Sequence, residues 1–139
     1  MSEKNIETVY PLAPMQQGMI FHSLYAPASG VYVEQLTGVL EGELNIPAFE
    51  RAWQNAIARH SILRTAFATK NLDKMFQVVH RRVHFAFDQL DWRACSSTEQ
   101  SARLDEFLRA DRARGFDLAR APLMRLALMR TADDVWRFV

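Results

Sequence analysis

The chain has 139 residues, of which 49% are hydrophobic and 24% charged. Hydrophobic content at this level excludes disorder for the chain as a whole, and the length gives room for one domain with a modest core. Lys and Arg number 17 against 16 Asp and Glu, so the net charge is +1. So small a charge creates no long-range field that would collect nucleic acid or anionic lipid, and we expect neither as a partner.

The cysteine content and the lack of long apolar runs indicate a cytoplasmic protein. Cys95 is the single cysteine, which rules out an internal disulfide, and we expect its thiol to be inert rather than nucleophilic. No apolar run approaches the ~20 residues that a membrane-spanning helix needs, so no membrane partner is expected.

The first predicted helix follows a proline-rich lead-in. Pro11 and Pro14 bias the residues before them away from helix, and Pro14 then opens a helix that runs to about Tyr25. Apolar residues surround this helix nearly completely, which predicts burial on most sides. Gly18 costs roughly 1 kcal/mol relative to alanine, so it indicates close approach by another backbone or by a ligand. His22 lies on an apolar face, where a core role and a functional role both stay open.

A strand and a second helix are predicted before the centre of the chain. A turn rich in Pro, Ser and Gly ends at Gly30, and residues 31–40 read as a strand. The helix begins near Asn45, which can cap it, and Pro47 fits its first turn because no hydrogen bond is lost there. Its apolar residues recur at three- and four-residue steps, so one face must be covered.

Residues 59–67, Arg-His-Ser-Ile-Leu-Arg-Thr-Ala-Phe, mark the change from helical to strand periodicity. Alternation from Ile62 onward predicts a strand that places Arg64 on a face shared with small apolar groups. A cation in such surroundings requires a carboxylate. We therefore expect Arg64 to form a structural ion pair; an exposed edge position and a contact with substrate are the alternatives.

A hairpin is predicted over residues 63–87, because residues 71–74 supply turn chemistry between two strand-like runs. In its second arm, His80 and His84 are expected to face solvent. Their spacing is that of helical metal ligands, but on a strand it spans about 13 Å, which is too far for one ion. No metal site is therefore predicted.

The rest of the chain predicts a third helix and two final strands, completing one layered α/β unit with a mixed sheet and three helices. Ser97 and Gln100 have capping-box spacing at the start of a helix that ends at Gly115. Alternation then predicts one strand, and a polar turn separates it from a last strand at 135–139. Because natural ends are usually polar and loose, we expect the native protein to continue beyond this apolar strand.

Three segments of the chain resemble signatures of the condensation domains of nonribosomal peptide synthetases. Residues 12–25 are similar to P-L-S-P-M-Q-x-G-M-L-F-H, with Ala13 in place of Ser and Ile20 in place of Leu. The central stretch is similar to R-H-E-x-L-R-T-x-F, with Ser61 in place of Glu. Residues 116–123 resemble F-D-L-x-x-x-P-L, and the first two signatures follow in the family's order and at about its spacing.

This resemblance implies part of the N-terminal lobe of a chloramphenicol acetyltransferase-like fold. Residues 1–139 would be a fragment that ends just before the family's His-His-x-x-x-Asp-Gly loop. The run from His84 to Asp88 has the same His-x-x-x-Asp spacing, but Val83 and Gln89 stand where the paired His and the Gly would be. Because this run also lies within a predicted strand, no catalytic residue is assigned in the chain.

The resemblance also implies a function. The parent enzyme would form an amide bond, in which the amine of a carrier-bound acceptor aminoacyl thioester attacks a carrier-bound donor acyl or peptidyl thioester. No cofactor would bind directly, and phosphopantetheine would arrive on the donor and acceptor carrier domains. The remainder of the condensation domain and a downstream adenylation domain are the other implied partners, and an antibiotic or lipopeptide is the implied kind of product.

Particular residues receive roles from the same resemblance. Arg64 would stabilise the lobe through a carboxylate supplied from beyond Val139. The substrate tunnel would be bordered by the first helix, through Gln16, Gly18, Met19 and His22.

Other interpretations stay open. One is a non-catalytic interaction or folding module, which the missing histidine loop favours for residues 1–139 alone. Another is a complete small acyltransferase that uses His84 and Asp88. A signature that begins within about ten residues of Met1 also allows a starter domain with a fatty acyl donor.

Overall fold

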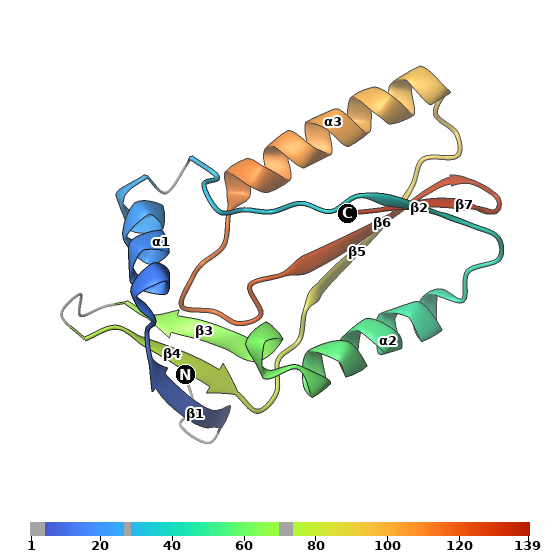
Figure 1. Cartoon of the computed structure of the whole chain (residues 1–139). Helices are drawn as coiled ribbons and strands as arrows, with labels where there is room; N and C mark the ends of the chain where they lie inside the picture. Colours follow the sequence, from blue (N-terminus) through green and yellow to red (C-terminus); the bar gives the residue numbers. More distant parts are fainter. Residues whose placement is uncertain (1–4, 27–28, 70–73) are drawn as a thin grey trace.

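The computed structural model describes residues 5–26, 29–69 and 74–139, which contain three α-helices and two β-sheets (Figure 1). The helices are α1 (Pro14–Tyr25), α2 (Ile46–Arg59) and α3 (Ser97–Arg114). The strands are β1 (Ile6–Pro11), β2 (Gly38–Glu41), β3 (Thr65–Ala68), β4 (Phe76–His80), β5 (Ala86–Asp91), β6 (Arg125–Ala132) and β7 (Val135–Phe138). The α/β class is confirmed, but the strands divide between two sheets.

The two sheets differ in the direction of their strands. The smaller sheet has the order β1-β4-β3 and is antiparallel throughout. The larger sheet has the order β2-β7-β6-β5 and is mixed, because β5 pairs with β6 in parallel while the other pairs are antiparallel. None of the helices in the described ranges is long and apolar enough to cross a membrane.

The core is built around β6. Residues Leu126–Met129 are between 0 and 5% exposed, and since successive side chains of a strand point to opposite faces, both faces of β6 are covered. On one face Met129 packs near Phe107 of α3. On the other, Phe87 pairs in register with Leu126 and lies 6.2 Å from Phe49 of α2, measured between ring centroids. The larger sheet is therefore enclosed between α2 and α3 (Figure 1).

The predicted second helix is confirmed, together with its cap. The Asn45 side chain accepts a hydrogen bond from the Ala48 amide at 3.0 Å, and Pro47 lies in the first turn. Ile57 is fully buried, as the apolar periodicity predicted for the covered face.

The third helix starts with a different cap from the predicted one. Ser96 and Glu99 form the capping box, in which the Glu99 carboxylate accepts from the Ser96 amide at 2.7 Å. A carboxylate is favoured there over Gln100 because it also interacts with the positive end of the helix dipole. Gln100 instead donates to the Trp92 and Thr131 carbonyls, both at 3.0 Å. The predicted end is confirmed, since Gly115 has a φ of 57°.

The predicted strand at residues 31–40 is wrong for most of its length. A turn closed by the Val33 amide on the Gly30 carbonyl, with Tyr32 at a φ of 62°, prevents extended pairing at its start. From there to Gly38 the chain forms a crossover that pairs with no strand of the described residues, and pairing begins only in β2.

The predicted hairpin over residues 63–87 is also wrong, although β3 and β4 do pair in antiparallel fashion. β4 ends at His80, and the chain then passes to the larger sheet, where Ala86 begins β5. His80 was expected to face solvent but is buried, and this burial lowers the pKa of its imidazole. The turn predicted at residues 71–74 lies largely outside the described residues.

Burial of the first helix on most sides was wrong as well. Ile20 is its buried residue, whereas Met15 is 78% and Tyr25 83% exposed. Apolar residues all round a helix show that it is hydrophobic but do not identify which face is covered. In Figure 1, α1 stands at one end of the molecule beside β3 and β4.

Replacing Leu128 by Ala should lower the free energy of unfolding by about 2–5 kcal/mol, because a fully buried side chain leaves a cavity between two covered faces. Urea denaturation followed by circular dichroism measures this change. Leu36→Ala, at a side chain that is 74% exposed, is the control and should change the midpoint little. Equal effects of the two variants would contradict the central position assigned to β6.

Candidate functional site

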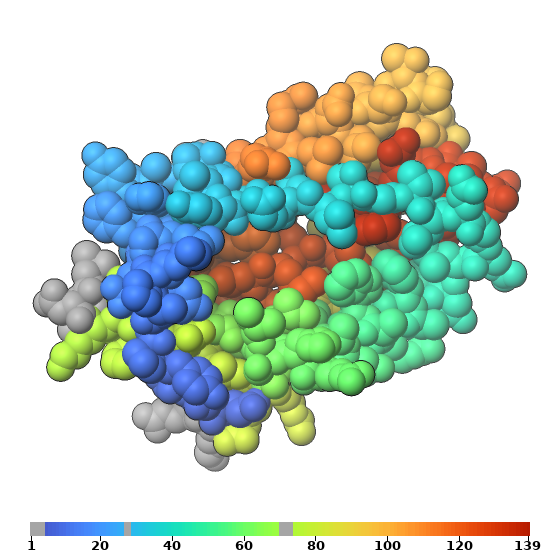
Figure 2. Space-filling view, viewed as in Figure 1, coloured from blue at the N-terminus to red at the C-terminus, as the bar shows by residue number. Residues whose placement is uncertain are grey.

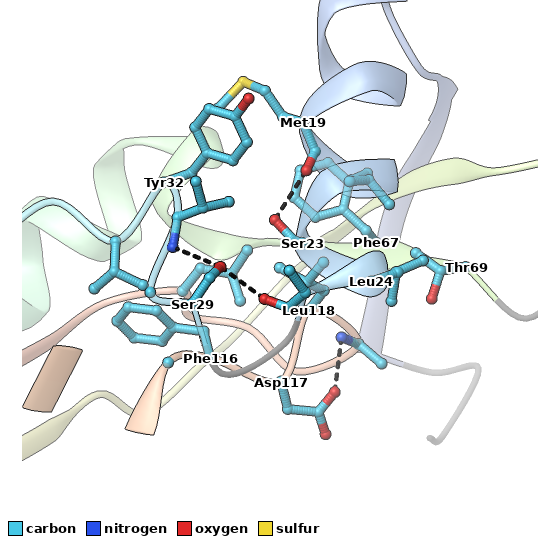
Figure 3. A pocket seen from close by; sticks show the side chains of 18 of the residues that line it. Met19, Ser23, Leu24, Ser29, Tyr32, Phe67, Thr69, Phe116, Asp117 and Leu118 are labelled. Carbon is cyan, nitrogen blue, oxygen red and sulfur yellow. Dashed lines mark hydrogen bonds between the residues drawn. The ribbon is translucent and has the colours of Figure 1, made fainter. Parts of the chain in front are cut away.

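A pocket of about 540 Å³ lies between α1, residues 29–33, the end of β3 and residues 115–119 (Figure 3). This volume is within the range of about 300–1,000 Å³ that small-molecule sites occupy. Its lining is mainly apolar, with a few polar groups. The apolar side chains include those of Met19, Ile20, Leu24, Val33, Phe67, Phe116, Leu118 and Leu123, and the polar ones those of Gln16, Ser23, Ser29, Thr69 and Asp117.

One wall of the pocket is a face of α1. The Gln16 side chain accepts from the Ala13 amide at 2.9 Å, and its own amide lies 3.4 Å from the Gln77 side chain of β4. Ser23 donates to the Met19 carbonyl at 2.9 Å, which satisfies its hydroxyl within the helix. Both polar side chains of this wall are therefore held by hydrogen bonds.

The structure brings together two of the four residues for which a tunnel role was predicted. Gln16 and Met19 line the pocket. Gly18 faces open space, since a Cβ built on it meets nothing within 4 Å in the part of the chain that is described. His22 is not among the lining residues, but its Nδ1 lies 3.0 Å from the hydroxyl of Tyr32, which does line the pocket. A tunnel role for these four residues stays a prediction.

The opposite walls come from segments that were not assigned to the site from the sequence. Phe67 lies at the end of β3, and its amide donates to the Leu118 carbonyl at 2.7 Å, joining two walls. Phe67 and Leu118 both fall within the segments that resemble family signatures. The resemblance of these segments to family signatures could have indicated a functional role. Neither segment, however, has a periodicity that shows which side chains face a cavity.

His84 and Asp88 are both exposed and do not form a site with the pocket. His84 lies in the connection between β4 and β5, so the expectation that it lies within a strand was wrong, while Asp88 is in β5. His84 borders a separate groove beside Arg114 and Arg120. Across the described ranges, no three His, Cys, Asp or Glu side chains gather closely enough to hold a metal ion.

Arg64 is buried, but its position differs from the predicted one. Residues 61–64 form a short 3-10 helix, and the strand begins only at Thr65. Arg64 Nη1 lies 2.6 Å from the Glu7 carboxylate of β1 and also donates to the His80 carbonyl. The carboxylate that pairs with Arg64 was expected from beyond Val139, but it comes from Glu7, which precedes Arg64 in the chain. Nε of Arg64 has no hydrogen-bond partner among the described residues.

Another ion pair, in which both side chains are mostly buried, lies at the end of α3, beside the pocket. Arg125, the first residue of β6, donates through Nε to the Asp111 carboxylate, and both side chains are at most 13% exposed. Gln35 of the crossover donates to the same carboxylate at 2.8 Å. Burial raises the pKa of Asp111, but the hydrogen bonds from Arg125 and Gln35 outweigh it, so this pKa lies below its usual value. The carboxylate is therefore ionised at neutral pH.

Comparison with known proteins identifies the family. The family model described as Condensation domain matches residues 6–139. The chain belongs to the condensation domain family. One of the linear gramicidin synthase proteins of Brevibacillus parabrevis is 51% identical over 134 residues, which are 96% of this chain and 3% of that protein. Surfactin synthase subunit 3 of Bacillus subtilis is 33% identical over 138 residues, covering 99% of this chain and 11% of that protein.

Solved structures confirm the fold of this condensation domain chain. The starter condensation domain of rhizomide synthetase RzmA matches with a TM-score of 0.79 and 25% identity, over 95% of this chain and 32% of that one. A four-domain nonribosomal peptide synthetase, holo-AB3403, matches with a TM-score of 0.77 over 96% of this chain and 10% of that one. Its identity of 14% supports the fold alone. The predicted chloramphenicol acetyltransferase-like lobe is thereby confirmed.

Replacing Arg64 by Ala should lower the free energy of unfolding by about 3 kcal/mol, because it removes a buried guanidinium bonded to Glu7 and to the His80 carbonyl. Chemical denaturation at pH 7 provides the measurement. Arg93 is the matched control, since it is also held in ion pairs, with Asp91 and Asp133, but its side chain is 40% exposed, and Arg93→Ala should cost much less. A smaller effect at Arg64 than at Arg93 would be incompatible with a structural ion pair.

The stabilisation that Asp111 provides should depend on pH in one direction. Its folded pKa lies below its usual value, so the stabilisation is complete above the unfolded pKa of about 3.9 and is lost as the pH falls toward the lower folded value. The difference in unfolding midpoint between the wild type and Asp111→Asn should thus be constant above about pH 5 and shrink below about pH 4. A difference that grows on acidification would overturn this assignment.

Proposed function

We propose that this chain is the N-terminal part of the N-terminal lobe of a condensation domain, ending just before the His-His-x-x-x-Asp-Gly loop. Its parent would form an amide bond between a carrier-bound donor acyl or peptidyl thioester and a carrier-bound acceptor aminoacyl thioester. The chain spans 3% of the gramicidin synthase protein and 32% of the starter condensation domain, which supports a contribution to a larger assembly.

The apolar pocket is the observation that carries this proposal. Its lining includes residues from each of the three segments that resemble family signatures. Among them are Met19 from residues 12–25, Phe67 from residues 59–67 and Leu118 from residues 116–123. Three segments far apart in the chain, each similar to a family signature, thus contribute to one cavity. In the proposed assembly this cavity is a wall of the tunnel in which the two thioesters meet.

Amide formation between two thioesters depends on positioning. An amine is already a nucleophile, so an enzyme gains chiefly by holding it against the thioester carbonyl, which can remove several kcal/mol from the barrier. A preformed apolar wall with satisfied polar groups suits this task. The pocket offers such a wall, with Gln16 and Ser23 already engaged in hydrogen bonds.

The partners follow from the same proposal. Phosphopantetheine would be delivered on donor and acceptor carrier domains, without a cofactor bound directly by this chain. The remainder of the condensation domain and a downstream adenylation domain would be its neighbours, and the 3% of the gramicidin synthase protein that the chain spans leaves room for them. The proton of the attacking amine would be handled outside residues 1–139, since His84 borders a separate groove.

Two alternatives rest on specific observations. A non-catalytic interaction or folding module fits the exposed positions of His84 and Asp88, which do not form a reactive pair with the pocket. A starter domain with a fatty acyl donor fits the apolar lining and the likeness to a starter condensation domain that was solved with C8-CoA.

Acyl transfer between loaded carrier proteins tests the proposal. Residues 1–139 alone should give no turnover, whereas the parent condensation domain should transfer the acyl group. His84→Ala in that domain should leave the rate within about twofold of the wild type, because surface substitutions away from a site have small effects. Turnover by residues 1–139 that His84→Ala abolishes would establish the small acyltransferase instead, and an inactive parent domain would leave the interaction module.

A further inference from the structure

Two walls of the pocket are made by segments without regular secondary structure, residues 29–33 and 115–119. Such segments are usually mobile unless side chains fix them. A pocket of defined shape therefore requires groups that hold both segments. The structure supplies these groups in one cluster at the last turns of α3.

Arg125 holds the second of these walls. Its Nη1 donates to the Gly115 carbonyl at 2.6 Å and its Nη2 to the Asp111 carbonyl at 2.6 Å, while Nε is bonded to the Asp111 carboxylate. The guanidinium also lies over the Phe116 ring, 4.2 Å from its centroid. All three nitrogens are thus used, in a planar fork that lysine cannot reproduce. Gly115 and Phe116 are fixed where they enter the pocket.

Gln35 holds the crossover to the same helix end. Its amide nitrogen donates to the Asp111 carboxylate at 2.8 Å and to the Leu108 carbonyl at 3.0 Å, while its oxygen accepts from Arg112 at 3.2 Å. Gly30 packs so closely that a Cβ there would lie 2.7 Å from Cγ of Arg112. In the space-filling view, the crossover lies against the C-terminal end of α3 (Figure 2).

Asp111 therefore connects the two walls through one carboxylate. One oxygen accepts from Arg125, and the other accepts from Gln35. A carboxylate with two fixed donors in a mostly buried place has a single orientation, and so do the groups that it binds. Loss of Arg125, Asp111 or Gln35 would remove the hydrogen bonds that fix one wall of the pocket, whereas β6 would stay enclosed by α2 and α3.

We propose that Arg125, Asp111 and Gln35 are positioning residues that set the width of the pocket and thereby the size of the acyl group it admits. The second part rests on the proposed function, whereas the first concerns this chain alone. None of the three needs to touch the reacting atoms. Their effect is exerted through Phe116 on one wall and residues 29–33 on the other.

Hydrogen exchange of the wild-type chain and three variants tests the positioning role. Arg125→Met keeps the stem over Phe116 but removes every donor, so the Ala119 and Arg120 amides, which close the turn at Asp117, should exchange about tenfold faster. Gln35→Leu should accelerate the Val33 amide and leave residues 115–120 unchanged. Arg109→Met, at an exposed arginine on the same helix, should change neither segment.

The outcomes separate a local role from a general one. Unchanged exchange at residues 115–120 in Arg125→Met, or equal acceleration there and in β6, would overturn the proposal. Should Arg125→Met not fold, Arg125→Lys keeps the charge without the fork and should still accelerate the 115–120 segment selectively. No selective acceleration in the lysine variant would count against the cluster as well.

Donor selectivity tests the second part in the parent condensation domain. The ratio of kcat/KM for octanoyl and acetyl carrier thioesters should move toward one by about fivefold in Arg125→Lys, as a less defined pocket discriminates less, and should not move in Arg109→Met. An equal loss for both donors would refute the role in selectivity. If the wild-type domain transfers neither donor, the proposed function fails, and the exchange experiment still decides the positioning role.

Discussion

Burial of β6 on both faces is the constraint on which the rest of this structure depends. Because α2 covers one face and α3 the other, the larger sheet is enclosed and α3 has a fixed axis relative to β6. The first residue of β6, Arg125, is thereby held beside the last turns of α3. The ion pair with Asp111 and the wall of the pocket that it supports follow from this packing.

The pocket does not lie within either sheet. It lies between α1, the end of β3 and two irregular segments, one of which follows the end of α3 (Figure 3). The core therefore positions the elements that flank the pocket, while polar side chains position its walls. Core packing mainly provides stability, whereas the buried polar contacts of Asp111 contribute both to stability and to the shape of the pocket walls.

Regular elements were the part that the sequence predicted well. Asn45 and Pro47 identified the start of α2, and Gly115 the end of α3, because each residue has one local physical role. Predictions that required knowledge of neighbours were wrong: alternation could not show that residues 31–37 pair with no strand in the described part of the chain, nor that the chain leaves one sheet after His80. Of the site, resemblance to family signatures pointed to α1, but the facing segments carried no periodicity from which to infer orientation.

Buried arginines at the starts of strands offer a signal that periodicity misses. Arg64 directly precedes β3, and Arg125 is the first residue of β6, whose next four residues are buried. The residue at the start of a buried apolar strand lies close to the interior. A guanidinium at that position needs hydrogen-bond acceptors, because a buried charge without partners is costly. Glu7 and Asp111 lie 57 and 14 residues away from their arginines. The sequence can therefore show that such a cation needs a carboxylate, while only the fold determines which carboxylate it is.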